Sequence, residues 1–476
     1  MFEIVLVNPP HLGSLLFNRE GRCQQKVSSF GYLMVPMSLI YIASLLNREG
    51  FSVQVIDCMA EENGNIDYLL DRLEYISHQL TITAVSTPTF LNDIRVIELI
   101  KDRIDTHLSA IGLHVTVLSH RSLVHSKLDS VIRGEPELTS LELAKALINR
   151  GSLNNVTGLS YKYEGRVFHN PDRTPIENLD ALPFPARELL HINRYCLPMN
   201  LKPYTFIIPS RGCWHDCIFC QVRDYYGKKL RLRNIDNVMF EIEEIVGKFN
   251  ITDIAILSDN FTLNKDFVVQ FCEGLLNKKL KISWMANSRV DTVDYPLLSL
   301  MKKAGCYGLS YGVESGNQHI LDKAKKNITI AQTEEAFYSS RKVGIRTLAQ
   351  VILGLPGENK STIKKTLDLL IKINPDFVQF NCAVPYPGTE LYELMLEKNH
   401  IEEDSWEFFE ANSPLLNIDG LSTEEIKRQR ILCYLIFYCR PKYLIKLCKV
   451  LGKDIKVNKR IIKGLRKYIQ EWVLNN

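Results

Sequence analysis

Short apolar runs alternate with longer amphipathic stretches through the first 150 residues. The runs are rich in Val and Ile, as is typical of strands buried on both faces of a parallel sheet. The predicted strands are Ile4–Asn8, Val53–Asp57, Ile82–Ser86, Val115–Leu118 and Val131–Arg133. Apolar positions at helical spacing predict intervening helices, for example over Met37–Glu49 and Ile94–Ile104. The pattern indicates an α/β fold that begins with a doubly wound, Rossmann-like parallel-sheet domain over residues 1–150.

The patterning changes in residues 151–200, which we interpret as a linker between two domains. Ser160–Phe168 alternates around Glu164 and Gly165, and this predicts a β-hairpin. Prolines punctuate the following stretch, Leu179–Arg187, which is therefore expected to be extended. We expect this connector to clamp the two domains face to face.

A second strand–helix alternation occupies residues 201–395. Six units are recognisable, and they predict a partial (β/α)6, TIM-like barrel. Their strands are Thr205–Pro209, Ile254–Leu257, Ser283–Asn287, Gly308–Gly312, Thr347–Leu353 and Phe377–Ala383. Active sites of barrels lie at the C-terminal ends of the strands, so candidate chemistry is sought in the loops that follow them.

The last segment, residues 396–476, has helical patterning and an excess of positive charge. From Leu421 to Asn476 there are 14 Lys and Arg against 4 Asp and Glu, whereas the whole chain has a net charge of only +4. Two stretches, Arg440–Lys449 and Lys459–Lys467, are basic and amphipathic. We favour a solvated helix face that covers the barrel, with a peripheral contact to anionic lipid as the alternative. Nucleic acid is not expected as a partner.

Composition favours a soluble globular protein of the cytoplasm. The chain is 46% hydrophobic and 24% charged, both ordinary values. Met1–Pro10 lacks a basic n-region and predicts a first strand, not a signal peptide. The longest apolar run, Ile431–Cys439, is well short of the roughly 18 residues that span a bilayer. Twelve cysteines without a secretion signal favour a reducing compartment and metal chemistry over a disulfide framework.

Three of these cysteines, Cys213, Cys217 and Cys220, have the spacing C-x3-C-x2-C on one short loop. Three thiolates can bind three irons of a four-iron cluster and leave the fourth iron without a protein ligand. A cluster used only for electron transfer normally has four cysteines, whereas an open metal position can chelate a substrate. Zinc is the weaker alternative, because His215 would have to fold back between two cysteines to complete four ligands. Unliganded core cysteines are a further alternative.

With this loop, the chain resembles the radical S-adenosylmethionine (radical SAM) enzymes. In that family the open iron binds the amino and carboxylate groups of S-adenosylmethionine, and the reduced [4Fe–4S] cluster cleaves it to a 5′-deoxyadenosyl radical. Phe219 matches the aromatic residue that usually precedes the third cysteine. The resemblance also implies an external reductant of the flavodoxin or ferredoxin type.

Further landmarks follow successive predicted strands, and the resemblance implies that they contact S-adenosylmethionine. Ser258-Asp259-Asn260 corresponds to the loop that binds the methionine amino group. Arg289 is expected to reach the methionine carboxylate or a neighbouring acid. Glu314 is expected to accept hydrogen bonds from the ribose hydroxyls or the amine. Ile352 and Gly354 lie on a strand and turn whose backbone is expected to meet the adenine.

The first domain resembles the cobalamin-binding domain that precedes many radical SAM domains. In such sheets a ligand lies at the carboxyl ends of the strands, where small residues allow close approach. The chain departs from the family at Ile111 and Pro136, where glycines are usual, and it lacks the D-x-H-x-x-G motif. We therefore expect no histidine on cobalt and a structural role for His114. The implied cobalamin contacts are Asn8, Pro9, Ser86, Thr87, Gly112 and Glu135.

Taken together, these features predict a cobalamin-dependent radical SAM methyltransferase that acts on an unactivated carbon. A non-methylating relative that performs ring closure, rearrangement or carbon–carbon coupling is the nearest alternative. The first domain would then bind cobalamin as an electron donor or only pack on the barrel. A non-catalytic cobalamin or redox sensor is an alternative of another class. The substrate is left open, as a small molecule, a peptide or a lipid-like compound.

Overall fold

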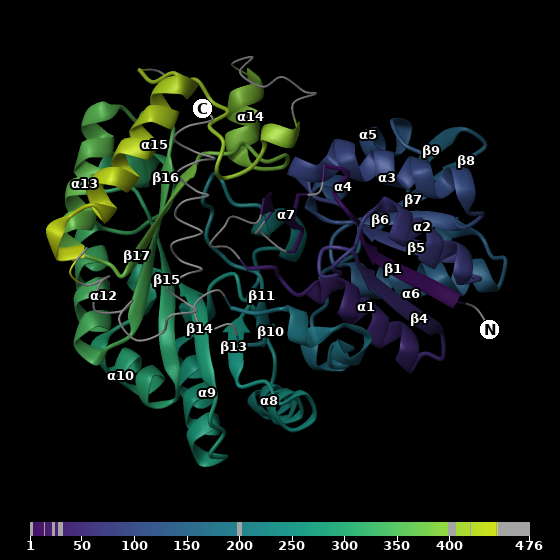
Figure 1. The fold of residues 1–476 in the computed structure, drawn as a ribbon, viewed down its shortest axis with the longest axis horizontal. Coiled ribbons are helices and arrows are strands. Elements are labelled where there is room, and N and C mark those ends of the chain that lie inside the picture. Colours follow the sequence, from purple (N-terminus) through teal and green to yellow (C-terminus); the bar gives the residue numbers. More distant parts are fainter. Residues whose placement is uncertain are drawn as a thin grey trace.

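The computed structural model describes residues 3–13, 15–20, 24–26, 32–197, 202–397, 406–418, 420–443 and 445. Two mostly parallel sheets with their helices lie next to each other, one built from the first third of the chain and one from the middle (Figure 1). The helices α14 (Glu390–Glu397) and α15 (Thr423–Tyr438) lie at the upper edge of the second sheet in this view.

The first sheet has seven strands in the order β4-β1-β5-β6-β7-β8-β9. The first five strands in this order are parallel, and the last two are antiparallel. Their bounds are β1 Glu3–Asn8, β4 Ser52–Asp57, β5 Leu80–Ala84, β6 His107–Ile111, β7 Ser130–Ile132, β8 Leu159–Tyr163 and β9 Arg166–His169. The predicted hairpin is thus present as β8 and β9, with φ of 48° at Glu164 and 74° at Gly165, and it extends the first sheet.

Helices cover both faces of this sheet, which confirms the doubly wound fold. Along β1, Ile4 and Leu6 pack with one set of helices and Val5 and Val7 with the other, as the two-residue period of a strand requires. The first set is α1 (Met37–Arg48) and α6 (Pro136–Ile148), and the second is α2 (Ile66–Tyr75) and α3 (Phe90–Arg103). Short elements complete the domain: β2 Phe17–Asn18, β3 Gln25–Lys26, α4 Leu113–Val117 and α5 Ser119–Val124.

One predicted strand is wrong. Val115–Leu118 lies in the helix α4 and the turn after it, and the strand between β5 and β7 is β6, which the sequence pattern missed. Gly112, with φ of 131°, ends β6, and the backbone N–H and hydroxyl of Thr116 both donate to the Gly112 carbonyl, at 3.0 and 2.8 Å. Strand preference of β-branched residues reflects packing on a sheet, and here β6 already occupies the position.

The second sheet has six parallel strands in the order β10-β13-β14-β15-β16-β17. All six predicted strands are present, with ends shifted by up to two residues. Their bounds are β10 Tyr204–Ile207, β13 Asp253–Ile256, β14 Ser283–Ser288, β15 Cys306–Glu314, β16 Arg346–Leu353 and β17 Phe377–Cys382. Among the described residues no ladder joins β17 to β10, so the barrel is partial, as expected.

Helices connect the barrel strands, and their ends follow from the sequence. Thr329 and Gln332 form a capping box at the start of α12, which ends at Gly344 with φ of 76°. The helices are α7 Val222–Tyr226, α8 Ile235–Phe249, α9 Lys265–Asn277, α10 Tyr295–Lys303, α11 Gln318–Lys323, α12 Ile330–Val343 and α13 Lys360–Ile373. A two-stranded antiparallel ladder, β11 Ser210–Arg211 with β12 Arg231–Leu232, stands beside the first barrel strand.

The C-terminal segment contacts both domains. Trp406 and Phe409 are fully buried, and the Trp406 ring lies 4.9 Å from the ring of His114 in the first domain. Arg430 on α15 donates to the Phe380 carbonyl of β17 at 2.7 Å. Half of Arg440–Lys449 and all of Lys459–Lys467 lie outside the described residues. In the described part of the chain, no helix combines the length and apolarity needed to cross a bilayer.

Candidate active site

The three cysteines lie on the loop between β11 and α7, after the first strand of the barrel. Gly212 opens the loop with φ of 89°, and a Cβ there would lie 2.2 Å from the Lys229 carbonyl oxygen, so a side chain does not fit. The middle of the loop is held by its backbone. The N–H of Ile218 donates to the Ala324 carbonyl at 3.2 Å, and the Ile218 carbonyl accepts from Leu391 at 2.9 Å. The sequence and the fold therefore hold this loop in one place.

Cys213, Cys217 and Cys220 are partly exposed and form no disulfide. In the part of the chain that is described, no three His, Cys, Asp or Glu side chains converge on one metal ion. An iron–sulfur cluster does not require such convergence, because each cysteine binds a different iron. Burial raises the pKa of Cys217 to about 11, so cluster binding would release its proton. Three cysteine thiols on a loop held by its backbone fit the donor set of a cluster with one open iron.

The loop after β13 is tied to the cysteine loop. The Asp259 carboxylate accepts from the Gly212 N–H at 3.0 Å, and the hydroxyls of Ser258 and Ser210 lie 2.7 Å apart. Asn260 is buried, and its side-chain Nδ2 has no hydrogen-bond partner. A buried amide without a partner needs an explanation, and a ligand acceptor supplies one. The geometry thus brings this predicted S-adenosylmethionine loop directly beside the cysteines.

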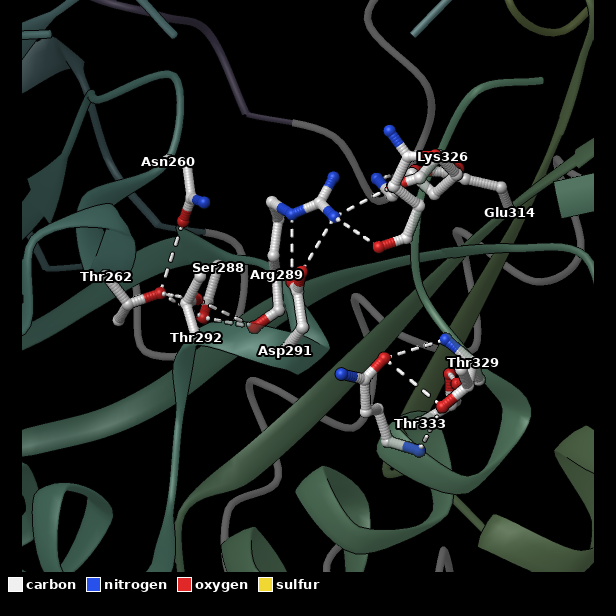
Figure 2. A network of polar contacts seen from close by, with 12 residues as sticks. Asn260, Thr262, Ser288, Arg289, Asp291, Thr292, Glu314, Lys326, Thr329 and Thr333 are labelled. Atoms are coloured by element: carbon white, nitrogen blue, oxygen red, sulfur yellow. Dashed lines mark hydrogen bonds and ion pairs between the residues drawn. The ribbon is translucent and has the colours of Figure 1, made fainter. Parts of the chain in front are cut away.

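Glu314 and Lys326 form a buried ion pair, with 2.7 Å between Oε1 and Nζ (Figure 2). Glu314 ends β15 at a register shift and has φ of 60°, a left-handed conformation that is uncommon for residues other than glycine. A Cβ on Gly312 would lie 2.4 Å from the Glu314 carboxylate and 2.6 Å from the Lys326 ammonium. The glycine therefore makes room for this ion pair at the C-terminal end of the strand.

Arg289, which follows β14, is engaged by a neighbouring acid. Its Nε and Nη2 both donate to the Asp291 carboxylate at 2.9 Å, and Nη2 also donates to the Lys326 carbonyl at 2.8 Å (Figure 2). The guanidinium therefore braces the backbone next to Lys326. Contact with a methionine carboxylate stays a prediction.

Lys326 is a site residue that nothing in the sequence singles out. It belongs to the run Lys323-Ala-Lys-Lys-Asn327, which has the composition of a solvated surface. Its neighbour Lys325 is indeed exposed and pairs with Glu390 at the surface. Lys326 instead turns inward, where it meets Glu314 and lies close enough to Cys217 to lower that thiol's pKa against the larger effect of burial. The two lysines therefore differ in their partners: Lys326 meets the end of β15, and Lys325 meets the start of α14 at the surface.

The turn after β16 is closed by a buried acid. Gly354 has φ of 90°, and its N–H donates to Glu358 Oε2 at 2.6 Å, while Glu358 Oε1 is buried without a partner. Burial raises the pKa of Glu358 from its ordinary value of 4.5 to about 8. Ile352, two residues before Gly354, is half-buried. The predicted adenine contacts therefore lie on a turn that is fixed by a neutral carboxylic acid.

We expect Glu358→Gln to change the pH dependence of stability. Between pH 4.5 and about 8 the carboxyl ionises in the unfolded chain but stays protonated in the folded enzyme. The unfolded state then binds fewer protons, so stability falls as pH rises through this window. The amide keeps an acceptor for Gly354 and does not titrate. Relative to the native enzyme, the variant should gain up to about 1.4 kcal/mol for each pH unit in the window. Thermal midpoints from pH 5 to 8 measure this, and curves that stay parallel would contradict it.

Most residues predicted to contact cobalamin lie at the strand ends of the first sheet. Asn8 donates to Asp57 at 2.7 Å and, with Gly112, lines a small cavity. Pro9 is buried, the Ser86 hydroxyl lies 2.7 Å from that of Thr89, and the buried hydroxyl of Thr87 has no partner. This placement fits a ligand at the strand ends. Glu135 differs, because its carboxylate is held by an arginine of the second domain.

The strand ends of the first sheet face the cysteine loop. Tyr225, on the helix after that loop, lines the same cavity as Asn8 and Gly112. Gln24 connects the two sides: it accepts from the Thr87 N–H at 3.0 Å, and its Nε2 lies 3.5 Å from Oε1 of Gln221. Gln221 directly follows Cys220. Phe219, just before that cysteine, is half-buried against the core. A ligand at the first sheet would therefore lie next to the loop.

A partial barrel with a three-cysteine loop at its strand ends defines a radical SAM enzyme. Residues 207–370 match the model of the radical SAM superfamily. The uncharacterized methyltransferase PH0819 of Pyrococcus horikoshii is 31% identical over 99% of both chains. The chain therefore belongs to the radical SAM superfamily, and its relationship to this methyltransferase extends over nearly its whole length.

Two further comparisons bear on the chemistry and the fold. The anaerobic magnesium-protoporphyrin IX monomethyl ester cyclase of Rubrivivax gelatinosus is 27% identical over 86% of this chain and 74% of its own. Among solved structures, the cobalamin-dependent S-adenosylmethionine radical enzyme OxsB, with aqua-cobalamin and S-adenosylmethionine bound, has a TM-score of 0.73. That match is 17% identical and covers 98% of this chain and 71% of OxsB. At this identity it supports the two-domain fold.

Proposed function

We propose that this enzyme holds a [4Fe–4S] cluster on Cys213, Cys217 and Cys220 and transfers a methyl group to an unactivated carbon. The observation that carries the proposal is the position of the loop that bears these three cysteines, next to the strand ends of the first sheet. When bound, the cluster supplies the electron that cleaves S-adenosylmethionine to a 5′-deoxyadenosyl radical, and cobalamin supplies the methyl group.

The protein's own residues bind and orient the cofactors and enclose the place of reaction. Asn260 offers its unpartnered amide and Glu314 its carboxylate to the amino-acid and ribose groups of S-adenosylmethionine. The turn at Gly354 provides backbone beside the adenine. Asn8, Ser86, Thr87 and Gly112 provide the strand-end surface for cobalamin. The first domain meets the cysteine loop through Gln24 and Gln221, and bound cofactors and substrate between the two domains would limit access of water to a radical there.

Anaerobic reconstitution tests the cofactor content. We expect about four irons and one cobalt per chain after incubation with iron, sulfide and hydroxocobalamin, with a visible spectrum that contains both chromophores. Four irons without cobalt would leave a radical enzyme whose first domain serves packing or substrate binding. Iron far below four in every preparation would contradict the cluster itself.

A non-methylating reaction is the second candidate, and one observation favours it. The relative from Rubrivivax gelatinosus is named a cyclase and matches most of this chain. S-adenosylmethionine labelled in its methyl group separates the two candidates. Label in the product would support methyl transfer, and an unlabelled product formed together with 5′-deoxyadenosine would support ring closure or another rearrangement.

The substrate we propose is a small molecule, with a lipid-like compound included because of the basic C-terminal segment. A peripheral contact with anionic lipid and an external reductant of the flavodoxin or ferredoxin type are part of the same proposal. Binding of the full chain to anionic but not to neutral vesicles would support the lipid contact.

A further inference from the structure

The cysteine loop is anchored to the first domain by a buried ion cluster. Its arginines are Arg211 and Arg231, which face each other across the β11–β12 ladder at the base of the loop. Its acids are Glu135 and Glu137, at the start of α6 in the first domain. The side chains of all four residues are at most 3% exposed. The charged side chains at the base of the loop are therefore shielded from water.

Each arginine is held in a defined orientation. Arg231 donates from Nη2 and Nη1 to the two oxygens of Glu135, at 2.6 and 3.0 Å, the two-pronged geometry that suits arginine and carboxylate. Arg211 donates from Nη2 to Glu137 at 2.5 Å and lies 3.7 Å from Glu135. The Arg211 guanidinium also lies 5.5 Å from the Tyr41 ring and 5.4 Å from the Tyr226 ring. Lysine cannot reproduce these planar contacts.

Stability alone does not explain the arrangement of this ion cluster. Nη1 of Arg211, Nε of Arg231 and Oε2 of Glu137 are buried without a hydrogen bond. A buried ion pair gains little over apolar packing of the same volume, and each unsatisfied polar atom adds a cost. In some proteins such a pair instead fixes one relative orientation of the parts that it joins.

The position of Arg211 in the chain indicates why a fixed orientation matters here. Arg211 is two residues before Cys213, and Gly212 between them is bonded to Asp259 of the barrel. On the other side, Glu20 and Tyr225 line the cavity at the strand ends of the first sheet. Burial raises the pKa of Glu20 to about 7, and Arg211 and Glu137 lie close enough to act on it in opposite directions. A continuous set of buried charged side chains therefore connects this cavity to Cys213, the first of the three cysteines proposed to bind the iron–sulfur cluster.

We propose that Arg211, oriented by Glu137 and Glu135, is a positioning residue that sets the iron–sulfur loop against both the barrel and the first domain. The inference rests on the proposed cluster at Cys213, Cys217 and Cys220. A misplacement of about 1 Å can cost a reaction about a hundredfold, so a small shift of the loop has a measurable effect.

The test compares Arg211→Lys and Glu137→Gln with a matched control in the full-length enzyme. Arg211→Lys keeps the charge but loses the planar fork, and Glu137→Gln keeps an acceptor but loses the charge. The control is Asp129→Asn, which breaks a half-buried ion pair with Lys101 just before β7, at the edge of the first sheet opposite the strand ends that face the cysteine loop. For each protein, iron per chain, the thermal midpoint, the electron paramagnetic resonance spectrum of the reduced cluster with and without S-adenosylmethionine, and the rate of 5′-deoxyadenosine formation are measured.

We expect the two loop-base variants to keep wild-type iron, because all three cysteines remain. Their reduced-cluster spectra should differ from wild type on addition of S-adenosylmethionine, and 5′-deoxyadenosine formation should fall by about tenfold or more. The control should lose thermal stability and keep the wild-type spectrum and rate.

Wild-type spectra and rates in both loop-base variants would overturn the inference and leave the cluster of charges as a structural contact. If Arg211→Lys does not fold, Glu137→Gln decides alone, since it changes only one atom. A wild-type enzyme without iron would instead overturn the proposed function, and the two failures are therefore distinguishable.

Discussion

Replacing Cys217 with alanine is expected to remove the iron–sulfur cluster and reduce S-adenosylmethionine cleavage to background. Cys217 is the middle one of the three cysteines along the chain, and burial raises the pKa of its thiol to about 11. Two thiolates on the remaining loop leave two irons without a protein ligand, which is fewer contacts than a stable cluster has. Iron per chain, the visible spectrum and 5′-deoxyadenosine after reduction with dithionite measure the effect.

A cysteine elsewhere in the chain provides the control. Cys439, at the end of α15, is exposed and far along the chain from the loop, and Cys439→Ser should keep wild-type iron and cleavage. Persistent 5′-deoxyadenosine formation by the Cys217→Ala variant would contradict the cluster assignment. Equal loss in both variants would point to a general sensitivity of the protein to thiol replacement.

Lys326→Met is expected to give the second large effect. The substitution leaves the Glu314 carboxylate buried without its counter-charge, and breaking one side of a buried ion pair costs about 3–5 kcal/mol. Because Glu314 is also a predicted contact of S-adenosylmethionine, cleavage should fall together with stability. Thermal unfolding and 5′-deoxyadenosine formation under saturating S-adenosylmethionine report the two effects separately.

The neighbouring lysine is the matched control for this experiment. Lys325→Met breaks a surface pair with Glu390, in which both side chains are more than one third exposed, so the expected cost is at most about 1 kcal/mol. The double variant Lys326→Met/Glu314→Gln should recover much of the stability lost by Lys326→Met, since no unpaired charge remains. It should not recover cleavage. Equal effects of the two single lysine variants would contradict a special role for Lys326.

The strands of the barrel could be predicted closely because strand-like segments alternate regularly with helical patterns along this part of the chain. The same rule failed between β5 and β7. There His107–Ile111 is a central strand that contains His and Ser, and the β-branched Val115–Val117 belongs to a helix. Hydrophobic pattern reports burial of a segment but does not say which of two neighbouring segments takes the place in the sheet.

The cysteine loop could be predicted because its chemistry depends on spacing along the chain. The meeting of four further residues at one edge of the sheet could also be predicted, because each parallel strand delivers its next loop to that edge. These residues are Asn260, Arg289, Glu314 and Gly354. The residues that pair with these side chains could not be predicted from the sequence. Asp291 for Arg289, and Lys326 for Glu314, follow from contacts across the sheet that no spacing encodes.

The sequence by itself determined the two regions of alternating strands and helices, the spacing of the three cysteines and the family to which the chain belongs. These features depend on residues that are close together in the chain. They are visible as hydrophobic patterns with periods of two and 3.6 residues and as the spacing of the cysteines. Only the tertiary structure decided which charges are buried: Lys326 but not Lys325, and Glu135 and Glu137 against Arg211 and Arg231. Burial of a charge depends on which elements pack together, because only a neighbouring element can supply the opposite charge that makes it tolerable.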